Sequence, residues 1–122
     1  MLASLGFDSF VLDLQHGDID YREAVGILTA VAPSGATALV RLPWNDPATI
    51  MRMLDAGAFG VICPMVNSRA DAESFVGACR YPPTGYRSCG PIRATLQAHT
   101  DLRGYLRGRQ RLHRHDRADR DG

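Results

Sequence analysis

Three short apolar runs that alternate with three longer amphipathic segments constrain the fold of this chain more than any other feature. The apolar runs cover residues 8–14, 36–41 and 59–66, and the segments with apolar residues at helical spacing cover 20–32, 46–58 and 68–80. Strands that alternate with helices of this length are typical of parallel βαβ units with right-handed crossovers. The sequence therefore predicts an α/β fold built from three βα units.

Start and stop signals support the three helices. The candidate N-caps are Asp20, Asp46 and, as alternatives for the third helix, Ser68 and Asp71. Pro47 follows Asp46 directly, where its missing N–H and its fixed φ favour a helix start. Gly57 is expected to end the second helix, because glycine adopts the left-handed conformation that closes many helices.

The composition is that of a soluble protein with one globular domain. Of the 122 residues, 45% are hydrophobic and 22% are charged, and the net charge is +1. No apolar run approaches the ~20 residues that a membrane-spanning helix needs. The N-terminus also lacks the basic start and the cleavage site of a signal peptide. We therefore expect a cytoplasmic protein without a membrane partner.

The cysteine and lysine content argues against disulfides, a zinc site and Schiff-base catalysis. Cys63, Cys79 and Cys89 are odd in number and are not at C-x-x-C spacing. We therefore expect reduced thiols, with Cys63 and Cys79 in the core, and neither a disulfide framework nor a zinc site. All fourteen basic residues are arginine. Without lysine, no side chain of this chain can form a Schiff base with a carbonyl substrate.

Polar residues stand where the first two predicted strands end, at Asp13, Gln15, His16 and Arg41, and the third strand runs to Pro64–Met65. Ligands of parallel α/β folds bind at this edge of the sheet, so these residues predict a site. Histidine can accept a proton near neutral pH, which makes His16 the candidate base. Asp55 could hold its second ring nitrogen, and Arg41 could stabilise an oxyanion. A structural hydrogen bond, a solvated carboxylate and a salt bridge are the respective alternatives, and spacing leaves them open.

Four segments resemble one enzyme family. They are "GFDSFVLDLQHGDIDY" (6–21), "RLPWNDP" (41–47), "LDAGAFGVICPMV" (54–66) and "CRYPPTGYRS" (79–88). All are similar to the 4-hydroxy-2-oxoheptanedioate aldolases, which are class II pyruvate aldolases of the citrate lyase beta-subunit superfamily. The resemblance covers residues 2–94 and implies a (β/α)8 TIM barrel, of which this chain would hold three βα units near the N-terminal end.

The resemblance also implies an activity and three site residues. His16 matches the catalytic base in the family's Asp-x-Glu-His-Gly pattern, Asp55 matches the carboxylate that forms a dyad with it, and Arg41 matches the arginine that stabilises the pyruvate enolate. The implied reaction is cleavage of a 4-hydroxy-2-oxo acid to pyruvate and an aldehyde, in aromatic catabolism. The implied cofactor is a divalent metal, Mg²⁺ or Mn²⁺ with Co²⁺ as a further candidate, and the implied assembly is a homo-oligomer.

Two departures from the family pattern bear on activity. Gln15 stands where the family usually has glutamate, which removes a charge beside His16. The family's metal ligands, a glutamate and an aspartate, end later strands that have no counterpart in this chain. We therefore expect the 122-residue chain to bind no metal and to be inactive, with a non-catalytic structural or interaction role as the alternative.

The C-terminal part differs in composition from the rest. We expect residues 1–97 to form the partial barrel and residues 98–122, rich in Arg, Asp and His, to form an irregular or disordered tail. The codons allowed by residues 113–120 can be read one base later as a peptide that resembles the family's metal-site strand. This suggests a frameshift around residues 95–104. Seven arginines in the tail raise the alternative of a weak nucleic-acid-binding arm, which the interspersed aspartates argue against.

Overall fold

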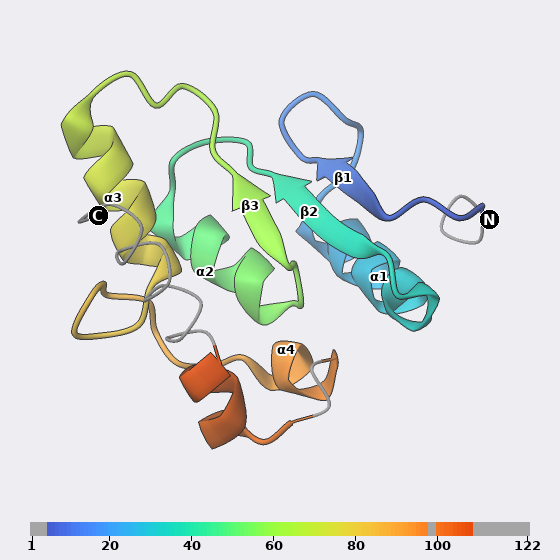
Figure 1. Cartoon of the computed structure of the whole chain (residues 1–122). Coiled ribbons are helices and arrows are strands. Elements are labelled where there is room, and N and C mark those ends of the chain that lie inside the picture. The colour runs from blue at the N-terminus through green and yellow to red at the C-terminus, as the bar shows by residue number, and fades with distance from the viewer. Residues whose placement is uncertain (1–4, 98–99, 109–122) are drawn as a thin grey trace, which may run out of the picture.

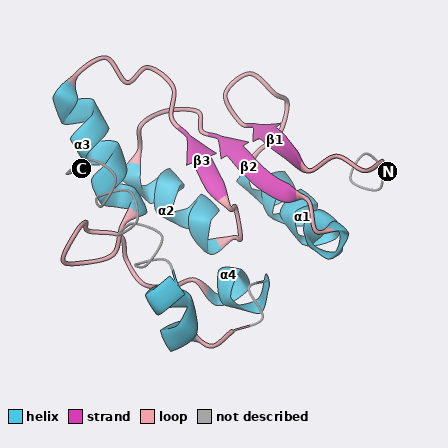
Figure 2. Cartoon of the chain, viewed as in Figure 1, coloured by secondary structure: helices cyan, strands magenta, loops and turns pink. Residues whose placement is uncertain are grey.

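The computed structural model describes residues 5–97 and 100–108. A parallel sheet of three strands, β1 (Ser9–Asp13), β2 (Thr37–Arg41) and β3 (Gly60–Ile62), has the strand order β1-β2-β3 (Figure 1). Crossover helices connect the strands, as Figure 2 shows by colour. The prediction of three parallel βα units is therefore confirmed.

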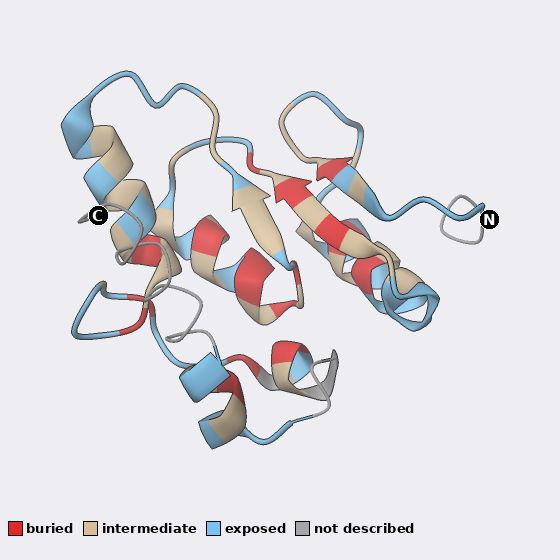
Figure 3. Ribbon diagram, in the orientation of Figure 1, coloured by how far each residue is buried: buried red, intermediate tan, exposed pale blue. Residues whose placement is uncertain are grey.

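One face of the sheet carries the hydrophobic core. Leu12 of β1 and Val40 of β2 belong to the same buried cluster as Leu28 of the first helix and Ile50 and Met53 of the second. The alternate strand residues point to the other face, which is covered less. Figure 3 shows this contrast between buried and exposed positions along the sheet.

The helices begin where the capping signals predicted. Helix α1 (Tyr21–Val31) has Asp20 as N-cap and is followed by the short 3-10 helix η2 (Ala32–Ser34). Helix α2 (Pro47–Asp55) has Asp46 as N-cap, and Gly57 takes a left-handed φ of 104° just after it.

Helix α3 (Arg69–Cys79) decides between the two alternative caps. Ser68 is the N-cap, and its side chain accepts a hydrogen bond from the backbone N–H of Asp71. Asp71 in turn accepts from the backbone N–H of Ser68 at 3.0 Å, so the two residues form a capping box.

Strand β3 is shorter than the predicted run of residues 59–66. Pro64 has no backbone N–H to donate to a neighbouring strand. Met65 adopts a left-handed φ of 56°, which turns the chain away from the extended conformation. The strand therefore stops at Ile62, and the apolar residues after it form a loop.

The segment after α3 is helical in part. Helix α4 (Ile92–Gln97) is followed by a helical stretch at residues 102–108. Tyr81, Ala94 and Tyr105 form a second buried cluster, so hydrophobic contact crosses the boundary that the sequence placed between residues 97 and 98. The remainder of the expected tail, residues 109–122, lies outside the described residues.

The prediction that Cys63 and Cys79 lie in the core is confirmed in part. Cys63 and Cys79 are half-buried against the core, Cys89 is exposed, and all three are free. Within residues 5–97 and 100–108, no helix is long and apolar enough to cross a membrane.

Candidate active site

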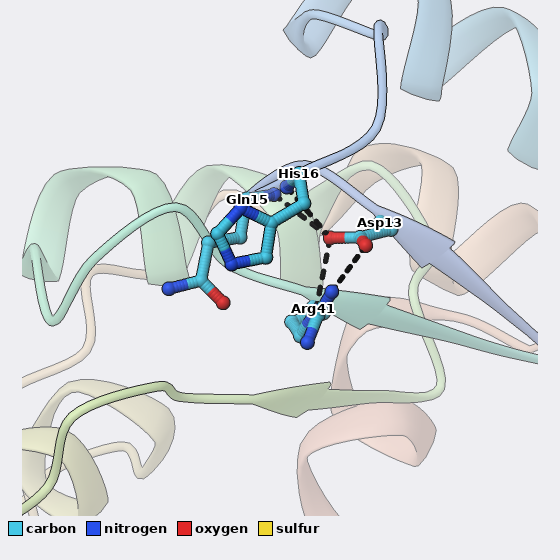
Figure 4. Close-up of polar contacts among 4 residues, drawn as sticks. All are labelled: Asp13, Gln15, His16 and Arg41. Atoms are coloured by element: carbon cyan, nitrogen blue, oxygen red, sulfur yellow. Dashed lines mark hydrogen bonds and ion pairs between the residues drawn. The ribbon is translucent and has the colours of Figure 1, made fainter.

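Asp13 and Arg41 form an ion pair at the carboxyl edge of the sheet. They are register partners in β1 and β2, so their side chains project from neighbouring positions. Arg41 donates from Nε to Asp13 Oδ1 at 2.9 Å and from Nη2 to Asp13 Oδ2 (Figure 4). This two-point contact fixes the plane of the guanidinium group, and about a third of each side chain remains exposed.

The same carboxylate holds the loop after β1. Asp13 Oδ1 accepts the backbone N–H of Gln15 at 3.0 Å and that of His16 at 3.1 Å. The turn is so tight that a Cβ on Gly17 would stand 2.1 Å from the backbone carbonyl oxygen of Asp13. Only glycine fits at this position without a shift of the backbone, so the local sequence builds the loop that carries His16.

These contacts stabilise the ionised form of Asp13. The hydrogen bond from Arg41, followed by that from the backbone N–H of His16, holds the pKa of the Asp13 carboxyl well below its usual range. The ion pair in turn raises the pKa of Arg41. Both groups are therefore charged at neutral pH.

His16 lies at the same edge, as predicted. It follows β1 in the Asp13 loop, its side chain is exposed, and Figure 4 shows it together with Gln15 beside the Asp13–Arg41 pair. The structure therefore places two of the three candidate residues, His16 and Arg41, on the same open edge of the sheet.

Asp55 does not join them within the chain. It is the last residue of α2, which leads into the amino end of β3, whereas His16 follows the carboxyl end of β1. Its Oδ1 accepts a hydrogen bond at 2.7 Å from Nη2 of Arg87, whose side chain is buried. A dyad of Asp55 with His16 inside one chain is therefore not formed, because the two residues belong to opposite ends of the sheet.

The described residues do not fit a divalent cation by themselves. Oδ1 of Asp13 is shared among three N–H donors and Oδ2 binds Arg41, while Gln15 offers only a neutral amide. Within residues 5–97 and 100–108, no group of three or more His, Cys, Asp or Glu side chains could hold a metal ion.

The sequence did not predict the roles of two important residues. Asp13 belongs to the predicted site, but its ion pair with Arg41 and its bonds to the loop after β1 were not expected, although an aspartate three places before His16 is a signal for a side chain that caps a loop. Arg87 was part of a resembling segment but had no role. Its guanidinium stacks over the ring of Tyr81 at 4.6 Å and binds Asp55, contacts that no spacing rule reveals.

The chain is similar to known aldolases in sequence and in fold. Residues 1–110 match the family model described as HpcH/HpaI aldolase/citrate lyase. A hydroxypyruvate/pyruvate aldolase of Rhizorhabdus wittichii is 47% identical over 96 residues, which are 79% of this chain and 38% of the relative. A 4-hydroxy-2-oxo-heptane-1,7-dioate aldolase of Salmonella heidelberg is 36% identical over 106 residues, 87% of this chain and 40% of the relative.

Solved structures show the same likeness. The crystal structure of an HpcH/HpaI aldolase from Desulfitobacterium hafniense has a TM-score of 0.77 at 31% identity, over 88% of this chain and 41% of that one. Macrophomate synthase has a TM-score of 0.68 at 29% identity, over 75% of this chain and 32% of that one. Both of these solved structures are TIM barrels. The chain spans about two fifths or less of the length of the two similar aldolases.

Proposed function

The chain belongs to the HpcH/HpaI aldolase/citrate lyase family, and we propose that its Arg41 and His16 serve the cleavage and formation of hydroxy-2-oxo acids in a complete barrel. The component that forms the enolate would be pyruvate or hydroxypyruvate, as the names of the relatives suggest. The supporting observation is the Arg41 guanidinium, fixed in its plane beside the loop that carries His16.

The two residues would divide the chemistry between them. In the cleavage direction, His16 accepts the proton of the 4-hydroxyl group while the C3–C4 bond breaks and an aldehyde leaves. The electron pair of that bond moves to the 2-oxo group, whose oxygen becomes the enolate oxyanion. Arg41 donates hydrogen bonds to this oxygen, and a proton added at C3 completes pyruvate.

We infer a divalent metal from the family and not from the residues of this chain. Members are generally dependent on a divalent metal, and we propose Mg²⁺, Mn²⁺ or Co²⁺ for the complete barrel. Bound there, the cation would polarise the 2-oxo group. The described residues supply no ligand set for the cation.

Asp55 can form the proposed dyad with His16 only if the two residues come from different copies of the chain. Because it lies at the opposite end of the sheet from His16, a dyad would need Asp55 from another copy of the chain. The expected homo-oligomer is then a condition of that part of the proposal.

A chimera tests the proposal in a complete barrel. In this barrel chimera, the residues of the Rhizorhabdus wittichii aldolase that match the chain are replaced by those of the chain. Release of pyruvate from 4-hydroxy-2-oxo acids is followed with lactate dehydrogenase and NADH, with added Mg²⁺ or Mn²⁺ and after chelation. We expect metal-dependent turnover that His16→Ala and Arg41→Ala each reduce by at least about 100-fold. A folded chimera that is inactive, or one that tolerates both substitutions, would overturn the proposal.

A further inference from the structure

We propose that Asp13 is a positioning residue that sets the orientation of Arg41 and His16 toward each other. The inference rests on the proposed function, because it concerns how the same site is held. In this proposal, Asp13 does not contact the substrate itself. It acts through Arg41 and His16, which do.

The first part of the argument is the geometry at Arg41. A guanidinium group has five N–H donors in one plane, and Asp13 engages the edge formed by Nε and Nη2. The Nη1 side of the group then remains as the edge that faces away from Asp13. Because the Asp13 carboxylate binds the Nε–Nη2 edge of the guanidinium group at two points, the Nη1 side is the part that can bind an oxyanion.

The second part is the geometry at His16. The oxygen that accepts from Arg41 Nε, Oδ1, also accepts the backbone N–H groups of Gln15 and His16. The Oδ1 atom of Asp13 therefore holds both the backbone of His16 and the guanidinium group of Arg41. A change that moves this oxygen would displace both residues, although they are 25 positions apart in the sequence.

The occupancy of the carboxylate excludes other roles for Asp13. Three donors share Oδ1 and Arg41 takes Oδ2, so Asp13 has little free capacity to accept a proton from a substrate or to bind a cation. A purely structural role, as a clamp between the ends of β1 and β2, is the competing explanation. It predicts a loss of stability without a specific effect on the site.

The first experiment examines the 122-residue chain directly by NMR. The readouts are the Nε–Hε signal of Arg41 and the hydrogen exchange of the His16 backbone amide, compared between the wild type, Asp13→Asn and Asp18→Asn. Asp18 is an exposed aspartate of the same loop and is the matched control. We expect Asp13→Asn to shift the Arg41 signal, speed its exchange with water and deprotect the His16 amide, while Asp18→Asn changes neither. Unchanged signals in Asp13→Asn would overturn the inference, whatever the activity of the family proves to be.

The second experiment is a double-mutant cycle in the barrel chimera. Asp13→Asn should lower kcat by about 10- to 100-fold, as is usual for residues that orient a catalytic group. In an Arg41→Ala background, the same substitution should cost less than about 2-fold, because the group that it positions is gone. Asp13→Glu should recover only part of the rate, because it keeps the charge but moves the oxygens.

The outcomes separate this inference from the proposed function. Additive effects of Asp13→Asn and Arg41→Ala on kcat would overturn the positioning role while leaving the aldolase proposal intact. An inactive chimera would overturn the aldolase proposal, and the NMR comparison would then decide alone whether Asp13 holds Arg41 and His16. If Asp13→Asn lowers the stability of the chimera without lowering its kcat, Asp13 is only a structural clamp.

Discussion

Arg87 donates a hydrogen bond from Nη2 to Oδ1 of Asp55 at 2.7 Å and so ties the end of α2 to the segment that follows α3. Only 3% of the Arg87 side chain is exposed, and 23% of that of Asp55. Among the described residues, the Nε of Arg87 and the hydroxyl of Tyr81 have no hydrogen-bond partner although they are buried. The ion pair is therefore the main compensation for a charge that folding removes from water.

We predict that Asp55→Ala destabilises the chain by about 3–5 kcal/mol, the usual cost of leaving one member of a buried pair alone. Urea unfolding followed by circular dichroism measures the effect. The control is Glu73→Ala, which breaks the Arg69–Glu73 pair, where 91% and 63% of the two side chains are exposed. The control should cost no more than about 0.5 kcal/mol. Equal costs for the two variants would contradict the structural importance of the Arg87 pair.

Gly17→Ala should destabilise the chain by about 1–3 kcal/mol, because the new methyl group would collide with the backbone carbonyl of Asp13. Gly26→Ala is the matched control: nothing lies within 4 Å of the added Cβ, and the position is inside α1. There the alanine should stabilise by about 0.5–1 kcal/mol. The measurement is the urea midpoint of each variant, and a neutral Gly17→Ala would show that the loop relaxes at no cost.

Acid should destabilise the chain through three carboxylates. Hydrogen bonds hold the pKa of each below its usual range: mainly from Arg41 for Asp13, from the Thr49 hydroxyl for Asp46 and from the Ser68 hydroxyl for Asp71. A depressed folded-state pKa contributes stability above the unfolded value of about 3.9, and this contribution is lost as the pH falls below that value. Asp71→Asn should therefore lower the urea midpoint at pH 7, and its deficit should shrink below about pH 4. A deficit that is independent of pH would contradict the assignment.

The three thiols should differ in reactivity. Burial raises the pKa of the Cys79 thiol to about 11, and burial also raises the pKa of Cys63. At pH 8 only about one Cys79 side chain in a thousand is then a thiolate, the reactive form. Titration with a chromogenic disulfide should show one fast thiol, Cys89, which is exposed, and Cys89→Ser should abolish that phase. A fast phase that survives Cys89→Ser would contradict the prediction.

The 122-residue chain by itself should show no aldolase turnover, and added Mg²⁺ or Mn²⁺ should not produce any. Its described carboxylates offer no ligand set, and Asp13 is engaged by Arg41. Gln15→Glu should also leave the chain inactive, since it adds one acidic group and no second ligand. The assay is pyruvate release at high protein concentration. Metal-dependent turnover that is lost in His16→Ala would contradict the prediction.

The local sequence was sufficient to predict the order of elements and the helix starts. Asp20, Asp46 and Ser68 cap the helices because a short polar side chain can bond the free N–H groups of the first turn, an effect confined to a few neighbouring residues. The positions of His16 and Arg41 at one edge also followed from the alternation of strands and helices. Such features depend on contacts close in sequence or on the direction of parallel strands.

Contacts between distant segments were not predictable in the same way. The pairing of Asp55 with Arg87 depends on how the chain after α3 returns to the end of α2, and no periodicity encodes that path. Tyr105 illustrates the same limit. A single buried aromatic residue among charged neighbours gave no helical pattern, yet residues 102–108 form a helix whose Tyr105 packs with Tyr81 and Ala94.

The strand order β1-β2-β3 repeats the order of the strands along the chain. Strands β2 and β3 therefore each pair with a strand that has already left the ribosome when they emerge themselves. Assembly can then proceed in the direction of translation, without waiting for a distant segment to be made. Stalled-ribosome complexes of increasing length should accordingly gain protease resistance in steps, one for each βα unit that has cleared the exit tunnel.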